Sequence, residues 1–126
     1  MTQYVRRLED IPGFSDIPLP GHQGIRATDK ILIDPVTGSK NFMLMWVQLY
    51  PESGTEQHTH PVEQAYFVLS GVLNVKIAGE EYVVEKNSAV LIPANVKHEV
   101  SAKGKEPALF LVIFSPPIKE LEARPH

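Results

Sequence analysis

Short apolar runs separated by turn signals follow one another through most of the chain. Residues 72–77 alternate apolar and polar positions, whereas residues 42–50 and 108–114 are apolar on both faces. Short strands with a turn after every few residues are typical of antiparallel sandwiches and barrels. The pattern therefore predicts an all-β fold. Its other strands are expected at residues 30–33, 65–69, 82–84 and 89–92.

The two ends of the chain do not follow this strand pattern. Three prolines and three glycines lie between residues 12 and 24, which excludes a long helix there. We expect residues 1–30 to form an extended arm over a barrel core of residues 31–115. Residues 116–126 form a tail, in which residues 118–123 are predicted to make one or two helical turns. The whole chain, 1–126, is interpreted as one domain.

Composition restricts the class of protein. Of 126 residues, 43% are hydrophobic and 21% are charged, which is typical of a globular domain. The net charge is −3 and no basic run is present, so we expect no nucleic-acid partner. The chain has no cysteine, which fits a reducing compartment. Its N-terminus has no apolar signal segment, and no apolar run is long enough for a membrane helix, so a cytoplasmic location is expected.

His58 and His60 stand two residues apart, immediately upstream of an apolar run. Residues i and i+2 of a strand point to the same face, about 6.6 Å apart along the backbone. Two imidazoles placed in this way can bind one divalent metal ion at about 2.0–2.1 Å each. The spacing predicts a chelating histidine pair on a β-strand.

The same region resembles the first conserved motif of the cupin superfamily. That motif runs G, five residues, H-x-H, three or four residues, E, six residues, G. Here HTH at 58–60 is followed by Gln64 and Gly71 at the matching positions. Glu52 stands where the first glycine is expected, and Gly54 is displaced from it by two residues.

A second stretch resembles the second cupin motif, G, five residues, P-x-G, two residues, H, three residues, N. Pro93 and His98 keep the spacing, while Asn87 and Asn95 replace the glycines and Ala102 replaces the last asparagine. Asparagine tolerates a left-handed backbone better than most residues, so both turns are expected to be kept. The resemblance implies a jelly-roll barrel, that is, a double-stranded β-helix.

Carried over residue by residue, the resemblance implies four metal ligands and one divalent transition ion. The ion could be Fe, Mn, Ni, Co or Zn. Gln64 departs from the usual glutamate and would leave the full charge of the ion uncompensated. Glu63 is an alternative ligand, but alternation sends it to the other face unless the strand is bulged. The expected ligands are His58, His60, Gln64 and His98.

Other polar residues receive roles by position. Tyr66 stands two residues after Gln64, so both side chains are expected on the same, inward face of the strand. There Tyr66 could act as an acid or pack in the core. Glu63, Tyr66 or a metal-bound water would have to serve in proton transfer. His22 and His126 are interpreted as surface or hydrogen-bonded residues.

These residues indicate a metal-dependent enzyme acting on a small oxygen-rich molecule. Dioxygenase, isomerase or cyclase, and lyase chemistry all remain open. The alternative is a non-catalytic barrel that binds a small ligand as a sensor or carrier. A metal-free epimerase ranks last because it needs a histidine–aspartate pair, and no aspartate follows Asp34.

The two strands that are apolar on both faces carry a further implication. A barrel wall facing water should alternate apolar and polar residues. The N-terminal arm or a second subunit must therefore cover the outer faces of residues 42–50 and 108–114. We expect a homodimer, since cupins commonly dimerise through such strands.

Overall fold

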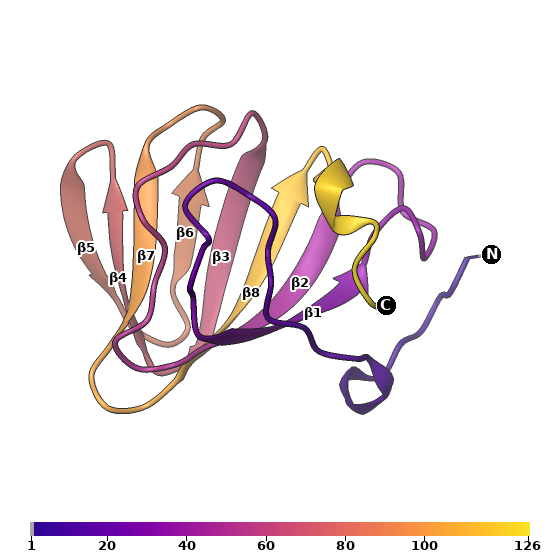
Figure 1. Cartoon of the computed structure of the whole chain (residues 1–126), viewed down its shortest axis with the longest axis horizontal. Helices are drawn as coiled ribbons and strands as arrows, with labels where there is room; N and C mark the ends of the chain where they lie inside the picture. Colours follow the sequence, from indigo (N-terminus) through magenta and orange to yellow (C-terminus); the bar gives the residue numbers. More distant parts are fainter. Residues whose placement is uncertain (1) are drawn as a thin grey trace.

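The computed structural model describes residues 2–126. Its strands form two antiparallel sheets that face each other (Figure 1), in the orders β1-β2-β8-β3-β6 and β5-β4-β7. The expected all-β jelly-roll fold is confirmed. The strands are β1 (Ala27–Ile33), β2 (Met43–Leu49), β3 (Glu63–Ser70), β4 (Val72–Ile77), β5 (Glu80–Val84), β6 (Ala89–Ile92), β7 (His98–Lys103) and β8 (Ala108–Ser115).

Period-two alternation builds the core between the sheets. In β2, every second residue is buried, starting from Met43, and β8 alternates in the same way over its whole length, starting from Ala108. The register joins these positions into rows across the larger sheet, such as Tyr66–Val112–Met45–Ile31. The inward-facing apolar side chains of both sheets thus meet in one core. A cavity lies at one side of this core.

Strand β1 begins three residues earlier than the sequence predicted. Ala27 already pairs with Leu49, and the backbone of Asp29 forms a bridge with Phe14. Polar residues at 28–30 hid this strand from a search for apolar runs. The longer strand places Asp29 at an inward-facing position.

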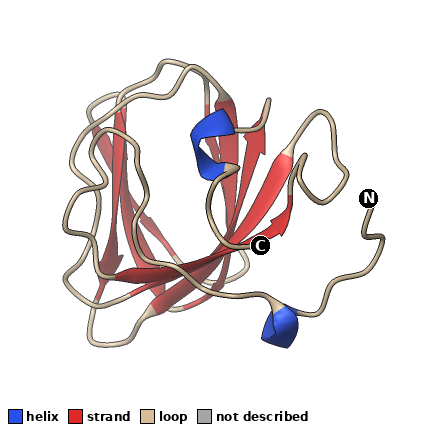
Figure 2. Ribbon diagram, turned by 45° about the vertical axis from the view of Figure 1, so that its right-hand side comes forward, coloured by secondary structure: helices blue, strands red, loops and turns tan. Residues whose placement is uncertain are grey.

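The segment before β1 crosses the space between the sheets, as Figures 1 and 2 show. Ile17, Leu19 and Ile25 pack against the core. The backbone N–H of Glu56 donates to the carbonyl of Gly21 at 2.9 Å. This segment therefore lies across the open end of the barrel and covers its mouth.

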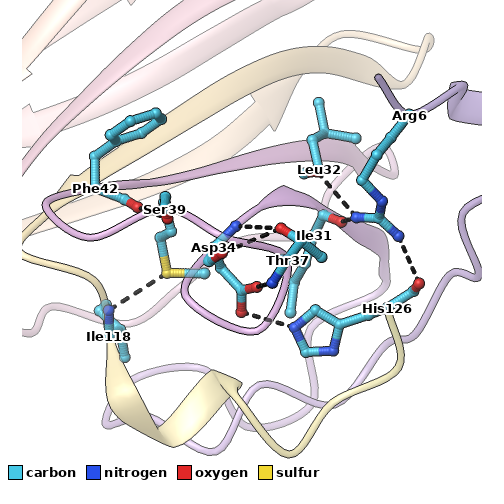
Figure 3. A network of polar contacts seen from close by, with 10 residues as sticks. Arg6, Ile31, Leu32, Asp34, Thr37, Ser39, Phe42, Ile118 and His126 are labelled. Carbon is cyan, nitrogen blue, oxygen red and sulfur yellow. Dashed lines mark hydrogen bonds and ion pairs between the residues drawn. The ribbon is translucent and has the colours of Figure 1, made fainter. Parts of the chain in front are cut away.

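A polar network joins both ends of the chain to the end of β1 (Figure 3). The guanidinium of Arg6 donates to the carbonyls of Ile31, Leu32 and His126 at 2.6–2.9 Å. The ring of His126 lies 2.7 Å from the buried carboxylate of Asp34. His126 is thus hydrogen-bonded and takes no part in the cavity, as its sequence context indicated.

The described helices are two 3-10 turns, Leu8–Asp10 and Lys119–Leu121. Neither has the length that crossing a membrane would require. The second turn lies inside the tail segment predicted to be helical.

The outer face of the larger sheet is apolar and uncovered. One cross-strand row runs Trp46–Leu111–Phe67, and the next runs Leu44–Ile113–Ala65–Leu91. Leu91, Ile113 and Phe67 are 61%, 43% and 41% exposed. Since the N-terminal segment packs on the mouth, it does not cover this face.

The turn geometry at Asn87 and Asn95 is as expected, and Glu52 of the first motif has it too. Asn87 and Asn95 both have φ of 65°, and Glu52 has φ of 61°. The backbone N–H of Asn95 also donates to the backbone carbonyl of His60 at 2.7 Å. A left-handed backbone is therefore built into both motifs without glycine.

We predict that Asn95→Ala lowers the free energy of unfolding by about 1 kcal/mol, because alanine fits the left-handed region poorly. Asn95→Gly should be nearly neutral. The matched control is Asn74→Ala, at an exposed position within β4. Urea denaturation measures all three, and equal losses in Asn95→Ala and Asn95→Gly would contradict the backbone explanation.

Candidate metal centre

The structure brings together the three histidines that the two motifs supply. His58 and His98 form an isolated antiparallel bridge, with reciprocal N–H to O=C hydrogen bonds of 3.0 Å each. His60 follows two residues later, and all three side chains are buried. His58 and His60 precede β3, which begins at Glu63, so the pair lies just outside the strand in which it was predicted.

The three rings converge at distances that suit one shared ion. Ring centroids are 4.2 Å apart for His58 and His98, 4.6 Å for His58 and His60, and 5.3 Å for His60 and His98. With metal–nitrogen bonds of about 2.1 Å, ring centroids lie roughly 3.2 Å from an ion, so ligands at 90–110° have centroids roughly 4.6–5.3 Å apart. The two spacings that involve His60 fall in this range, and the 4.2 Å spacing of His58 and His98 lies just below it, so the three rings lie close to the arrangement that a common ion requires.

Backbone carbonyls orient two of the rings. Nδ1 of His58 lies 2.6 Å from the carbonyl of Glu56, and Nδ1 of His98 lies 2.9 Å from that of Val96. A carbonyl can only accept, so each Nδ1 carries the proton and each Nε2 keeps its lone pair. This arrangement is the usual support for a metal-binding histidine.

The interpretation of His22 as a surface or hydrogen-bonded residue is wrong. It is half-buried, and its ring centroid lies 4.7 Å from that of His58 and 5.8 Å from that of His60. Ligand atoms of these three residues all lie within 4.8 Å of one another. Nε2 of His22 is buried without a hydrogen-bond partner among the described residues. His22 is thus a fourth imidazole at the cluster.

Gly21 explains how His22 reaches the cluster. Its φ is +80°, and a Cβ at this position would lie 2.8 Å from Nδ1 of His58. Only glycine lets the segment lie so close to the ring of His58. The pattern of apolar residues does not predict that this segment approaches His58. The one available signal in the sequence was a glycine next to a histidine in a proline-rich segment.

Gln64 and Tyr66 face the cluster from β3. The amide nitrogen of Gln64 donates to the phenol oxygen of Tyr66 at 3.0 Å and lies 3.2 Å from Nε2 of His98. Oε1 of Gln64 is buried, and no described residue bonds to it. Glu63 is exposed on the opposite face of β3. Of the two candidates for the oxygen ligand, Gln64 is the one at the cluster.

Burial keeps the imidazoles neutral. Burial, together with the neighbouring rings of His58, His60 and His98, lowers the pKa of His22 to about 3. The pKa of His60 falls to about 4 for the same reasons, while burial also lowers the pKa values of His58 and His98. Neutral rings offer lone pairs, which a metal ligand requires. The donor set therefore fits a divalent ion.

A cavity of about 70 Å³ opens beside the cluster. This volume can hold a few water molecules or part of a small ligand. Most of its wall is apolar, and no lysine or arginine occurs among the described residues that line it. The apolar lining includes Ile17, Leu19, Met45, Val47, Phe110 and Val112.

Asp29 also lines the cavity, and the sequence analysis missed it. It lies on β1, upstream of the region that was searched for a catalytic aspartate, and is only 5% exposed. Burial raises the pKa of this carboxyl from 3.8 to about 7. An aspartate of β1 therefore lines the cavity, because β1 begins earlier than predicted, although no described histidine is hydrogen-bonded to its carboxyl.

Comparison with known proteins identifies relatives of similar architecture. Residues 45–114 match the family model described as the cupin domain. The tetracenomycin polyketide synthase protein TcmJ of Streptomyces glaucescens is 26% identical over 98 residues, which are 77% of this chain and 66% of that protein. Auxin-binding protein 1 of Arabidopsis thaliana is 31% identical over 126 residues, covering 91% of this chain and 61% of that protein. The chain thus spans about two thirds of the length of these curated relatives.

Solved structures agree with this result. The polyketide cyclase RemF from Streptomyces resistomycificus has a TM-score of 0.77 at 26% identity, over 91% of this chain and 80% of that one. A predicted oxalate decarboxylase from Thermotoga maritima has a TM-score of 0.76 over 89% of this chain and 98% of that one. Its identity is only 16%, so it supports the fold alone.

We predict that Asp29→Asn stabilises the metal-free protein at high pH. A carboxyl whose pKa is raised in the folded state stabilises the fold fully below its unfolded value of 3.8 and loses this contribution as the pH rises through about 7. The variant should gain up to about 4 kcal/mol at pH 8 relative to pH 4, taking 1.36 kcal/mol per pH unit as an upper limit. Denaturant titrations at both pH values measure this gain, and a pH-independent difference from wild type would contradict it.

Proposed function

We propose that this chain, which belongs to the cupin family, is a divalent-metal-dependent enzyme that acts on a small, largely apolar carbonyl compound. The observation that carries the proposal is the convergence of four neutral imidazoles beside an apolar cavity. Our proposal assigns the ion to His58, His60 and His98, with His22 and Oε1 of Gln64 as further donors.

A divalent ion held there would act as a Lewis acid on a carbonyl oxygen. Histidine and amide donors suit iron, manganese, cobalt, nickel and zinc, so they do not select one metal. The chain itself supplies a dry, apolar enclosure in which a ligand dipole is weakly screened. Carbonyls of Glu56 and Val96 hold the rings of His58 and His98 in place.

Tyr66 is the proposed proton-holding group at this end of the cavity. Burial raises the pKa of its phenol, so the hydroxyl stays protonated at neutral pH. It accepts a hydrogen bond from Gln64 and can donate its own proton to a ligand oxygen. Glu63 is left out of the proposal because its side chain lies outside the cavity.

Among the reaction types that the sequence left open, ring closure of a keto compound has the most support. Two relatives at 26% identity are, by name, a polyketide synthase protein and a polyketide cyclase. Decarboxylation of a small dicarboxylate is less well supported, because the described cavity wall offers no cationic side chain. An apolar wall suits a hydrocarbon frame that carries few polar groups.

A non-catalytic binding barrel is the second candidate. One relative with 31% identity is named for binding auxin. A largely apolar cavity with a few inward polar groups is also what a small-ligand carrier needs. Turnover separates the two candidates, since both could hold a metal ion and a ligand.

We predict that protein purified without chelator contains about one transition metal ion per chain, because its four imidazoles are neutral and preoriented. His60→Ala and His98→Ala should lose most of this metal while keeping their β-sheet circular dichroism. The matched control is His126→Ala, since His126 pairs with Asp34 outside the cavity. Elemental analysis measures the metal content.

Turnover of aryl ketones and poly-keto compounds by the metal-loaded protein, lost on chelation, would support the enzyme. Metal without turnover across such a panel would favour the binding barrel. The proposal of a metal-dependent enzyme would be contradicted if the wild-type protein contained no metal, even after incubation with Zn²⁺, Fe²⁺, Mn²⁺, Ni²⁺ and Co²⁺.

We also propose that the apolar outer face of the larger sheet forms a homodimer interface. Trp46, Leu111 and Phe67 lie side by side across β2, β8 and β3. A stable interface buries about 800 Å² per partner, which a sheet face of this kind can supply.

We predict that Phe67→Lys converts the dimer to a monomer, because a charge in the centre of a buried apolar face is costly. The control is Val83→Lys, where an exposed apolar residue lies on β5 of the other sheet. Light scattering at micromolar concentration measures the mass. A monomeric wild type, or a dimeric Phe67→Lys variant, would count against this interface.

A further inference from the structure

Asp29 is an unpaired carboxyl at an inward-facing position of β1. The register places it in a row with Val47, Phe110 and Val68, all of which are apolar and buried. Burial alone raises the pKa of this carboxyl, and no hydrogen bond from a described residue contributes to the shift. Its oxygens are not among the fully buried atoms that lack a partner, so they are open to the cavity, where water or a ligand group can bond to them.

The histidine cluster lies on the other side of the same cavity. Asp29 belongs to the edge strand β1, whereas Gln64 belongs to β3, three strands along the sheet. The register also sets the two residues four positions apart along the strands, since Asp29 lies in the row of Val68. With about 4.8 Å between neighbouring strands and about 3.3 Å per residue, the two backbone positions are offset by roughly 14 Å across the strands and by roughly 13 Å along them. A ligand that touches both must therefore span the cavity.

Ser15 marks the entrance at the Asp29 end. Phe14 exchanges two backbone hydrogen bonds with Asp29, of 2.9 and 2.8 Å, and Ser15 follows it on the cavity wall. Ser15 is exposed while Asp29 is buried. The carboxyl thus lies just inside the mouth, where a ligand group that enters last would meet it.

We infer that Asp29 is a specificity-determining residue, which binds a hydroxyl group at the outer end of a ligand whose carbonyl oxygen lies at the histidine cluster. This inference rests on the proposed function. It names the substrate class more closely, as a ketone with a hydroxyl group at the far end of an apolar ring frame. Apolar residues on the wall between the two ends suit such a frame.

The test compares two bicyclic probes, 1-tetralone and 6-hydroxy-1-tetralone, which differ by one hydroxyl group. Calorimetry with Zn²⁺-loaded wild type should show about tenfold tighter binding of the hydroxylated ketone, as expected for one hydrogen bond to a buried carboxyl. Asp29→Leu should lose this preference, because leucine has a similar size but cannot accept a hydrogen bond. Asp29→Asn should keep most of it, because its amide oxygen can accept.

Asp10→Leu is the control, since Asp10 is exposed outside the cavity, and it should keep the wild-type preference. An Asp29→Leu variant with the wild-type preference would overturn the inference, and so would a loaded wild type that binds neither ketone. Metal content is measured on each sample, and the titrations are repeated without Zn²⁺. A preference that depends on Asp29 but comes without metal or turnover would contradict the proposed function and leave the subsite intact.

Discussion

The site depends on the backbone pairing of His58 with His98. Two reciprocal hydrogen bonds of 3.0 Å fix the loop that carries the first motif against the strand that carries the second. Gly54 shows how closely the two segments approach, since a Cβ there would lie 2.3 Å from the carbonyl of Val100. The displaced glycine of the first motif is thus required by packing, while Glu52 takes the left-handed turn. The joined backbones bring the two ring centroids to within 4.2 Å of each other.

The fold and the motif histidines could be predicted because their signals are local. Alternation along 72–77 specifies which face is buried, and the spacing of His58, His60 and His98 identifies the barrel. Asn87 and Asn95 were expected to replace glycine, and both have φ of 65°. In each case, the residues that carry the information are neighbours in sequence or stand at fixed distances from one another.

His22 and Asp29 could not be predicted, because their positions depend on tertiary structure. His22 reaches the cluster only because the segment before β1 folds back over the mouth and Gly21 lets it touch His58. Asp29 faces inward only because β1 begins at Ala27 and pairs with β2 from its first residue. A strand that begins with polar residues resembles a loop in sequence. Which of its side chains face inward can be determined only when its partner strand is known.

The polar groups of the cavity follow one energetic logic. Burial disfavours charge, so it keeps the imidazoles and the Tyr66 phenol neutral and opposes ionisation of Asp29. For the histidines, this state is the one that binds a metal ion, and the desolvation that lowers their proton affinity prepares their lone pairs. For Asp29, the same desolvation leaves a hydrogen-bonding group without a partner. In the proposed site, one apolar enclosure thus serves both ends of the cavity, each for a different part of a ligand, at the expense of stability in the empty protein.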